Sequence, residues 1–443
     1  MPNREELKKI FCQEIDRRKD EIIGTAIKVL ENPESGFREV KTSRTVSEIF
    51  STLGIPHESG LALTGVKGVL SGREPGSGVA ILGELDSLLV PDHPQADPRT
   101  GAAHACGHNA QIGMLIGAAI GFSASKILNA LSGRIIFMAV PAEEYIEIEF
   151  RNQLRQEGKI RFLAGKQEWI RMGAFDDVDL AMMTHTHVNP QGKKLGVGGT
   201  SNGMLAKKIQ FLGRGAHAGA APYKGINALN AAMIALSAIH AQRETFRERD
   251  TIRVHPIITK GGEAVNIVPS DVRMETFVRG KTMEAISNAD AQVDRCLRAG
   301  ALAVGGKVRI TTLPGYSPMR NDPGLQKVFL ANAVSLLGEE DTGETDAHMA
   351  GSTDMGDVSQ IIPAIHPYAG GASGISHGND FLIQDYEQAV INPAKAMGMT
   401  VIDLLAEGAV KAREVLATSK PPLTKTQYLE MMDGLLKEEE YEG

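Results

Sequence analysis

Five short segments of this sequence carry side chains that could bind a metal ion or move a proton. They supply a thiol, imidazoles and carboxylates, which are the groups that zinc and neighbouring transition metals take as ligands. Three of the segments directly follow apolar runs typical of buried strands. The residues are Asp86 in "GELDS", Cys106 and His108 in "HACGH", Glu143 and Glu144 in "PAEE", His185 and His187 in "THTH", and His377 in "SGISHGND".

Each segment alone also has a simpler explanation. A single cysteine is usually a small buried apolar residue, paired glutamates are usually solvated, and "HACGH" is equally compatible with a tight turn. The conjunction favours a metal site, because the carboxyl ends of parallel strands meet at one edge of a sheet. Two adjacent glutamates can then divide the work, one binding the metal and one acting as general base. A nearby carboxylate such as Asp86 would orient a ligand imidazole.

The elements that would position these residues follow from hydrophobic periodicity. Apolar runs bounded by glycine, such as "SGVAILGELD" and "GRIIFMAVPAEE", alternate with helical patterns and predict a largely parallel α/β sheet. Between about residues 203 and 315 the order becomes strand, helix, strand, strand, helix, strand, as in a ferredoxin-like sandwich. We therefore predict one α/β domain, 1–200 and 316–443, with a smaller domain, 201–315, inserted. The chain should end in one long helix over 386–417 and a solvated acidic tail, "LLKEEEYEG".

The composition excludes several classes of protein. The net charge of −7 and a sequence pI near 6.0 do not suit a nucleic-acid partner and leave a small molecule or a protein. The N-terminus "MPNREELKKIF" lacks the apolar core of a secretory signal, and no apolar run reaches the roughly 18 residues that span a bilayer. Three cysteines, Cys12, Cys106 and Cys296, form no disulfide pattern. We therefore expect a cytoplasmic protein without a membrane contact, in which Cys106 stays a free thiolate.

Six segments, read in order, resemble a family of metal-dependent amidohydrolases of the aminoacylase type. They are "ENPESGF", "HACGHN", "PAEE", "GRGAHAGAAP", "GGEAVNIVPSDVRMETFVRG" and "SHGND", and the resemblance runs from about residue 5 to about residue 410. The family includes hydrolases of N-acyl amino acids, hippurate, auxin conjugates and aminobenzoyl-glutamate. The resemblance implies a zinc-peptidase-like catalytic domain with a mixed sheet. The inserted domain would serve as a lid and build a homo-oligomer from dimers.

The same resemblance implies roles for individual residues. A divalent transition metal (Mn, Zn or Co), as one or two ions per subunit, would be held by Cys106, His108, Glu144, His185 and His377. His187 is the alternative to His185. Glu143 looks like the general base, and His217 like a lid histidine that stabilises the oxyanion across the dimer. Asn266 and Arg279 look like lid residues that contact the substrate, an arginine being suited to a carboxylate.

Two features depart from the common family pattern. Asn109 and Gln111 stand where many members have an acid and a histidine, which predicts looser metal retention and an uncertain second ion. A long polar segment, 145–175, contains the only tryptophan, Trp169, and should shape the pocket or an oligomer contact.

The predicted reaction is hydrolysis of a C–N bond in a small N-acyl or aromatic amino-acid-like substrate, or in a dipeptide. One alternative is an aminohydrolase that expels ammonia from an activated aromatic amine, as 5-nitroanthranilic acid aminohydrolase does. A non-catalytic binding protein is the alternative of another class, and the Glu143–Glu144 pair argues against it.

Overall fold

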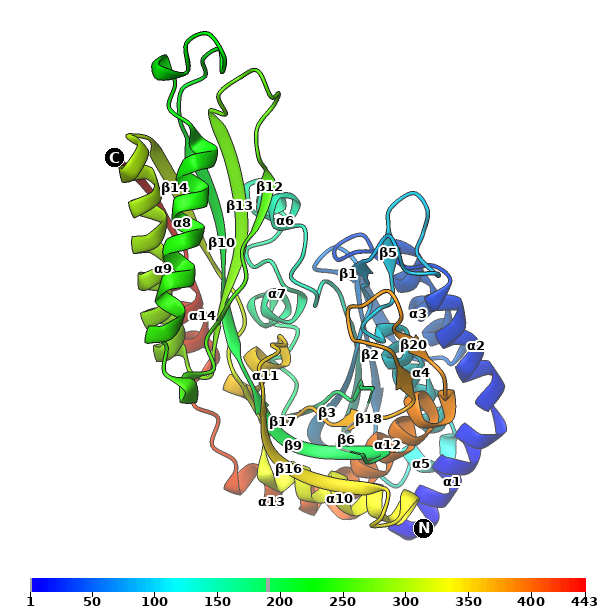
Figure 1. Ribbon diagram of the computed structural model, residues 1–443. Helices are drawn as coiled ribbons and strands as arrows, with labels where there is room; N and C mark the ends of the chain where they lie inside the picture. Colours follow the sequence, from blue (N-terminus) through cyan, green and yellow to red (C-terminus); the bar gives the residue numbers. More distant parts are fainter. Residues whose placement is uncertain (1, 189–191) are drawn as a thin grey trace.

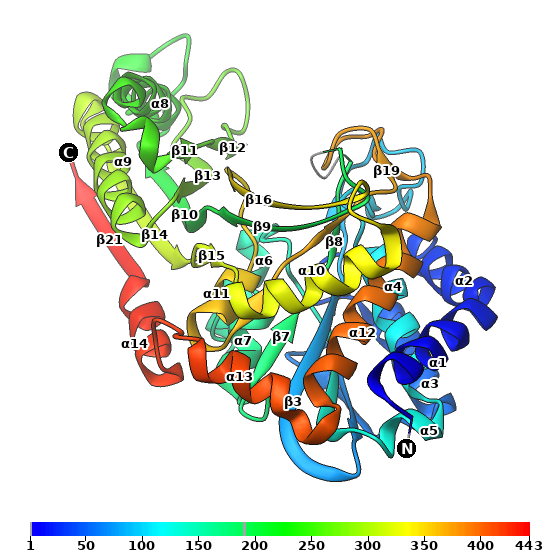
Figure 2. The same cartoon turned by 90° about the horizontal axis from the view of Figure 1, so that it is seen from below.

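The computed structural model describes residues 2–188 and 192–443, and three sheets organise them (Figure 1). A large sheet lies between layers of helices. A second sheet carries two long helices on one face and rises away from the first, and a third, smaller sheet joins the two (Figure 2).

The first sheet is mixed, which confirms the predicted fold class. Its strand order is β1-β2-β6-β3-β7-β17, with β6, β3, β7 and β17 parallel and β1 and β2 antiparallel at one edge. The strands are β1 (His57–Leu61), β2 (Gly65–Ser71), β6 (Ser132–Val140), β3 (Glu74–Glu84), β7 (Leu180–Met182) and β17 (Ala364–Ile365).

The apolar strands are buried on both faces, so alternate residues enter two separate cores. In β3, Val79 and Ile81 face one core, while Ala80 and Leu82 face the other. The first core is covered by α1 (Arg4–Arg17), α2 (Lys19–Leu30), α3 (Val40–Thr52), α4 (His108–Phe122), α10 (Pro323–Leu337) and α12 (Asn392–Leu405). The second is covered by α7 (Gly165–Met172), α11 (Met355–Ile361) and α14 (Lys425–Leu435).

Helix α4 is buried along its whole length, and its glycines allow that depth. A Cβ at Gly121 would lie 2.3 Å from the Phe11 ring, and one at Gly113 would lie 2.9 Å from Ala26. The helix begins directly after Gly107, whose φ of 88° suits glycine. This tight packing fixes His108, the first residue of α4, at the edge of the sheet.

The second sheet has the ferredoxin-like strand order that the sequence predicts. It runs β11-β13-β10-β14, with β12 also pairing with β13, and α8 and α9 pack on one face. The elements are β10 (Gly203–Leu212), α8 (Ala228–Gln242), β11 (Arg253–Val254), β12 (Ile257–Lys260), β13 (Asp271–Gly280), α9 (Met283–Val304) and β14 (Lys307–Pro314). We call this unit the lid; its limits at 201 and 315 as a separate domain stay a prediction.

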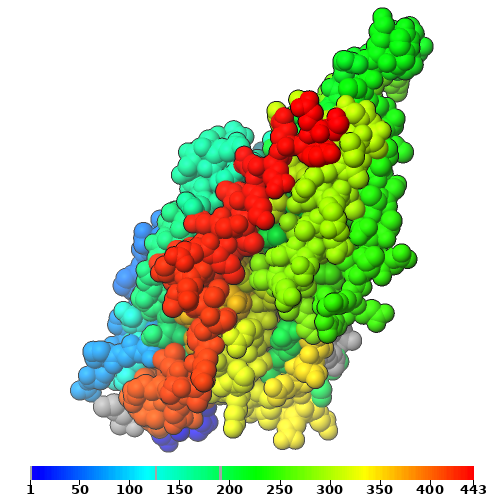
Figure 3. All heavy atoms as spheres, turned by 90° about the vertical axis from the view of Figure 1, so that its left-hand side faces the viewer, coloured from blue at the N-terminus to red at the C-terminus, as the bar shows by residue number. Residues whose placement is uncertain are grey.

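The C-terminal part of the chain differs from the prediction in two ways. The single long helix expected over 386–417 is wrong: after a π-helical turn (Glu387–Ile391), α12 ends at Leu405 and α13 (Val410–Thr418) follows. Gly408 and Ala409, with φ values of 74° and 58°, break the helix between them. The acidic tail is exposed at the surface, as expected (Figure 3), but it also forms a strand: β21 (Lys437–Glu442) pairs with β14 and extends the lid sheet.

The remaining elements connect these units. The third sheet has the order β15-β9-β18-β8, with β16 parallel to β9. Its strands are β15 (Met319–Arg320), β9 (Leu195–Ser201), β18 (Tyr368–Ala369), β8 (His185–Thr186) and β16 (Thr342–Met349). The short elements are β4 (Leu88–Leu89), β5 (Ala102–Ala103), α5 (Ser125–Leu128), α6 (Ile148–Gln156), β19 (Ala372–Ser373) and β20 (Leu382–Ile383). Within 2–188 and 192–443, no helix is both long and apolar enough to cross a membrane.

Candidate metal centre and active site

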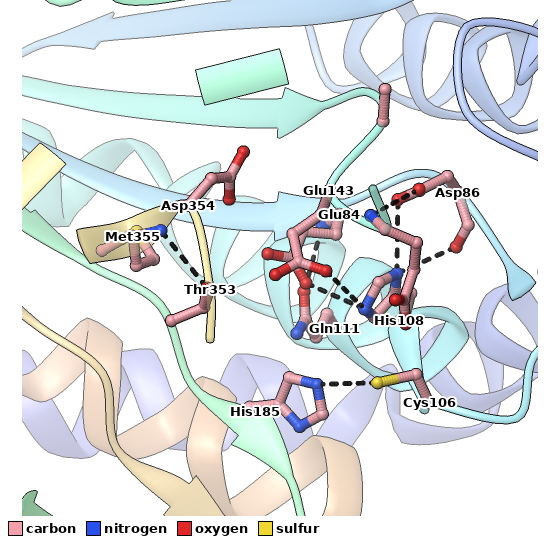
Figure 4. A network of polar contacts seen from close by, with 12 residues as sticks. Glu84, Asp86, Cys106, His108, Gln111, Glu143, His185, Thr353, Asp354 and Met355 are labelled. Carbon is pink, nitrogen blue, oxygen red and sulfur yellow. Dashed lines mark hydrogen bonds and ion pairs between the residues drawn. The ribbon is translucent and has the colours of Figure 1, made fainter. Parts of the chain in front are cut away.

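The predicted ligand segments meet at the carboxyl ends of the parallel strands (Figure 4). Glu84 ends β3, the Glu143–Glu144 pair follows β6, and His185 begins β8 just after β7. His108 approaches from the start of α4. These segments therefore lie together at one edge of the sheet.

Two groups of three donors share the thiol of Cys106. In one, Cys106 lies with His108 and His185, and in the other with Glu144 and His377; within each group the donor atoms are all within 4.8 Å of one another. The Cys106 Sγ and His185 Nε2 atoms are 3.3 Å apart, and His377 Nε2 is 3.4 Å from Glu144 Oε1. A shared thiolate between two such groups could hold one ion or bridge two.

His108 and His185 present the same ring nitrogen, Nε2, to the site. His108 Nδ1 donates to the carbonyl oxygen of Asp86 at 2.9 Å, and His185 Nδ1 donates to the carbonyl oxygen of Thr186 at 2.7 Å. These bonds orient each ring so that its Nε2 atom faces the cluster. Backbone carbonyls of this kind fix the tautomer and direction of metal-binding imidazoles.

The donor set favours a positive charge at its centre. At this site, the buried atoms without a hydrogen-bond partner include Glu84 Oε2, Asp86 Oδ1, His108 Nε2 and Glu144 Oε1. His108 Nε2 lies 3.0 Å from Glu84 Oε2 and 3.9 Å from Glu143 Oε2. Burial alone would lower the pKa of His108, but Glu84 and Asp86 outweigh it and hold that pKa well above its usual range. A divalent cation would satisfy these donors, so the residues fit a metal ion.

The same concentration of carboxylates affects Glu143 and Cys106. Burial, followed by the charges of Glu84 and Glu144, raises the pKa of Glu143 well above its usual range. Burial and the Glu144 carboxylate likewise raise the pKa of the Cys106 thiol. The expectation that Cys106 is a thiolate by itself therefore does not follow from its surroundings; a cation at the site is needed to favour the thiolate.

A buried lysine, which the sequence analysis missed, balances part of this charge. The Lys166 side chain is fully buried, and its Nζ atom lies 2.6 Å from Glu84 Oε1 and 2.5 Å from Asp354 Oδ1. Lys166 comes from α7 and Asp354 precedes α11, so no local motif joins them. Of the three residues, only Glu84 lies in a segment that the sequence singled out, because it is two residues before Asp86 at the end of the same strand.

The amides of Asn109 and Gln111 form hydrogen bonds with the backbone around the site. Gln111 Oε1 accepts a hydrogen bond from the backbone of Glu84 at 3.0 Å, and Asn109 Nδ2 donates to the Ala26 carbonyl at 3.4 Å. The Asp86 carboxylate lies between two parts of the site: its Oδ1 is 3.3 Å from His108 Nδ1, and its Oδ2 accepts a hydrogen bond from the Glu144 backbone at 2.9 Å. The two amides therefore support the protein around the site rather than changing its donors.

The geometry separates the two candidate strand histidines. His185 belongs to a donor cluster, whereas His187 belongs to none of those found among the described residues. The His187 ring instead stands edge-on to Tyr368, with centroids 5.8 Å apart. His104, the first histidine of "HACGH", is buried outside these clusters.

The structure does not bring His217 and Asn266 to the cluster. Both are exposed and lie in loops that pair with each other, Ala218 N donating to the Asn266 carbonyl at 2.9 Å. These loops follow β10 and β12 at the tip of the lid, far from the first sheet (Figure 1). His217 Nδ1 accepts hydrogen bonds from the backbones of Gly219 and Ala220, so the proton of the neutral ring is on Nε2.

Arg279 lies at the other end of the lid, where β13 approaches the first domain (Figure 1). Burial lowers the pKa of Arg279. The segment containing Trp169 also has a defined place: the indole is fully buried in the second core, against the helices of the first sheet.

Comparison with known proteins agrees with this arrangement. Residues 80–395 match Peptidase family M20/M25/M40. The mouse (Mus musculus) Xaa-Arg dipeptidase is 30% identical over 343 residues, covering 75% of this chain and 71% of that protein. The N-acyl-L-amino acid amidohydrolase of Geobacillus stearothermophilus is 27% identical over 330 residues, covering 72% of this chain and 81% of that protein.

Solved structures show the same fold. The aminobenzoyl-glutamate utilization protein of Klebsiella pneumoniae superposes with a TM-score of 0.67 at 17% identity, covering 88% of this chain and 97% of that one. A dinuclear metal-binding peptidase of the M20 family from Bacillus subtilis gives a TM-score of 0.61 at 22% identity, covering 87% and 98%. The chain belongs to the M20/M25/M40 family, as its motifs suggested, and is a hydrolase with a metal-binding site.

Proposed function

We propose that this protein hydrolyses the amide bond of a small N-acyl or aromatic-acyl amino acid, or of a dipeptide. The observation that carries the proposal is the pair of donor groups that share Cys106, with Glu143 beside them. Sequence relatives that act on N-acyl amino acids and dipeptides support this substrate class.

Cys106, His108 and His185 would hold one divalent ion, and Cys106, Glu144 and His377 a second. When bound, such an ion polarises the substrate carbonyl and makes water more acidic. Manganese, zinc and cobalt all suit a mixed set of thiolate, imidazole and carboxylate ligands.

Glu143 would act as the general base. It would accept a proton from the attacking water and pass it to the nitrogen of the leaving amine. Burial raises the pKa of Glu143, and a carboxylate of higher pKa is a stronger base for the first of these transfers. The Tyr316 hydroxyl donates to the Glu143 backbone carbonyl and fixes its position.

The lid would complete the site in a second copy of the chain. His217 offers an Nε2 proton that could stabilise negative charge on the carbonyl oxygen, yet it lies at the lid tip, away from its own cluster. Apolar residues are exposed on the same tip and on the neighbouring β12 and α8 surfaces, among them Tyr223, Val265, Ile267, Ile257 and Met233. Such a surface is typical of a protein interface, so a dimer built through the lid is favoured.

The aminohydrolase alternative gains no support from Asn109 and Gln111, because the hydrogen bonds of both amides are made with the backbone. A reducing, cytoplasmic setting agrees with three unpaired cysteines, one of which is a proposed ligand.

The test is a hydrolysis screen of N-benzoyl amino acids, other N-acyl amino acids, dipeptides and aminobenzoates with manganese, zinc or cobalt added. Release of both amino acid and ammonia is measured, so that the aminohydrolase alternative is tested in the same screen. Glu143→Gln should lower turnover by about 10²- to 10⁴-fold while the metal content stays the same. The matched control is Glu157→Gln, at an exposed glutamate outside the site. Full turnover by the Glu143→Gln variant would exclude Glu143 as the general base.

The dimer is tested by mixing two inactive variants, Glu143→Gln and His217→Ala. If His217 acts on the neighbouring copy, random pairing restores roughly one quarter of the sites. If His217 acts within its own chain, mixing restores no activity.

A further inference from the structure

The residue directly before the proposed general base has a strained backbone. Ala142 has a φ of 54°, in the left-handed region, where a residue with a Cβ atom is disfavoured. Such a conformation persists only where the surrounding structure holds it, and it is found mainly at active sites. Because Glu143 is the next residue, the backbone of Ala142 sets the direction in which the Glu143 side chain leaves the chain.

Hydrogen bonds hold the peptide groups on both sides of Ala142. The N–H donates to Glu39 Oε1 at 2.7 Å, and Thr64 Oγ1 donates to the other oxygen of that carboxylate at 2.6 Å. The carbonyl oxygen of Ala142 accepts from Arg151 Nη1 at 3.3 Å and from the Gly165 N–H at 3.3 Å. These contacts come from separate parts of the chain, so tertiary packing rather than a local turn holds the strained conformation.

Arg151 is the unusual member of this group. Its side chain is fully buried, and its Nε and Nη2 atoms have no hydrogen-bond partner. It forms no ion pair with any residue in 2–188 or 192–443, and its Nη1 donates only to the backbone carbonyls of Ala142 and Leu163. A buried charge without a counter-charge is costly, and an apolar side chain of similar size is often at least as stable. Local rules are broken in this way mainly at functional sites.

The segment that precedes Glu39 confines this guanidinium group against the Ala142 peptide. The Arg151 Cζ atom lies 5.4 Å from the centre of the Phe37 ring. A Cβ at Gly36 would overlap the Arg151 Nη2 atom and would lie 2.8 Å from the Ala142 Cα atom. The side chain therefore has little room to move away from the carbonyl that it contacts.

We propose that Arg151 is a positioning residue for the general base. By holding the Ala142 carbonyl, it maintains the strained backbone and directs the Glu143 carboxylate toward His108, where Glu143 Oε2 lies 3.9 Å from His108 Nε2. Without this contact, Ala142 relaxes to a negative φ and the carboxylate turns away from the attacking water. The inference rests on the proposed amide hydrolysis. It assigns a role to helix α6, which lies in the 145–175 segment that departs from the common family pattern.

The first test is the kinetics of Arg151→Met in the metal-loaded protein, with a substrate found in the hydrolysis screen. A displaced base should lower kcat by about 10- to 100-fold. KM and metal content should stay the same, because Glu143 acts on the proton and not on substrate binding. Arg151→Lys, which keeps a donor for the carbonyl, should lose less. The matched control is Arg155→Met, one turn later on α6, which should keep its kcat because Arg155 bonds to Asn152 and Glu438 instead.

Two double variants separate positioning from a general structural role. Glycine adopts a positive φ without strain, so adding Ala142→Gly to Arg151→Met should restore part of the lost kcat. In a Glu143→Gln background, Arg151→Met should lower the residual kcat no further, because the base is already absent. An undiminished kcat in Arg151→Met, or an equal loss with and without Glu143, overturns the proposal. Thermal melting checks that each variant is folded, and if Arg151→Met is not, the same comparisons are made with Arg151→Lys.

Crystal structures of the metal-loaded wild type and Arg151→Met separate this proposal from the proposed reaction. The φ of Ala142 should be positive in the wild type and negative in the variant, with the Glu143 carboxylate displaced from His108. An unchanged Ala142 backbone and Glu143 position in the variant overturns the positioning role even if amides are hydrolysed. A displaced carboxylate in a protein that hydrolyses no amide supports the positioning role and refutes the proposed reaction.

Discussion

Replacing Lys166 with methionine should destabilise the protein far more than the loss of an ordinary surface lysine. The side chain is fully buried and contacts two carboxylates, Glu84 and Asp354, that are themselves fully buried. Removing one partner of a buried ion pair leaves uncompensated charge and costs about 3–5 kcal/mol. The exposed pair of Lys425 with Asp176 should contribute at most about 1 kcal/mol, so Lys425→Met is the control.

The sign of the pH dependence follows from Glu84. Burial alone would raise its pKa, but Lys166 and His108 outweigh burial and lower the pKa to about 2. A lowered pKa in the folded state stabilises the protein above the unfolded pKa, near 4.3, and that stability is lost as the pH falls. Without Lys166 the pKa of Glu84 should rise, and a raised pKa destabilises the fold as the pH increases. The cost of Lys166→Met should therefore be greatest near pH 8 and smaller near pH 5.

The measurement is urea unfolding at pH 5, 6.5 and 8 with EDTA present, so that bound metal does not contribute to stability. Adding Asp354→Asn to Lys166→Met should recover part of the loss, because one of the two unpaired carboxylates is then neutral. A cost below about 1 kcal/mol, within the range of an exposed pair, or a cost independent of pH, would refute the reasoning.

Three further predictions follow from other parts of the structure. Cys106→Ala should lower the content of both proposed metal ions in elemental analysis, because both donor groups include its sulfur. Cys296→Ala, the control, should leave the metal content unchanged. Normal metal content in Cys106→Ala would exclude Cys106 as a shared ligand. Burial and the Asp354 charge raise the pKa of Asp357 to about 7, so the folded protein should lose stability as the pH rises through 7. A pKa raised by about 3 corresponds to roughly 4 kcal/mol of pH-dependent change in the free energy of unfolding. Asp357→Asn should abolish that change in urea unfolding measured across the pH range. Parallel pH profiles for the variant and the wild type would contradict the prediction. Gly121→Ala should cost about 1–3 kcal/mol, because its Cβ would lie 2.3 Å from the Phe11 ring. Gly24→Ala, with nothing within 4 Å, is the control, and equal melting temperatures would show that α4 can move.

The catalytic sheet and the donor residues could be predicted because their signals are local. An apolar run that ends in an ionisable residue indicates a buried strand, and it also places that residue at the edge of the sheet. Glu144 and His185 were recognisable on this basis and Cys106 by its place between two histidines, and the structure brings Cys106 close to both. The sequence of "HACGH" alone left a turn and a metal site equally open, and the shared position of Cys106 in two donor groups explains why the thiol lies between two histidines.

The parts that could not be predicted depend on partners far away in the chain. Lys166 and Asp354 are separated by 188 residues, and nothing near either residue indicates a buried ion pair. The sequence of β21, "KEEEYE", has no apolar face because an edge strand there exposes most of its side chains. Its strand conformation depends on pairing with β14, where Lys307 and Arg309 meet Glu442 and Glu440.

The position of β21 has a consequence for the order in which the protein can be completed during synthesis. Strand β14 is made more than a hundred residues before its outer neighbour, and the intervening chain includes α10 to α14 of the first domain. Until β21 has left the ribosome, β14 presents an unpaired edge that could bind another nascent strand. The basic side chains along that edge protect it in the meantime, since Lys307 and Arg309 would repel a second copy of themselves. Pairing of β21 with β14 therefore has to follow the synthesis of α10 to α14, and a chain truncated before residue 437 should aggregate more readily than one that includes β21.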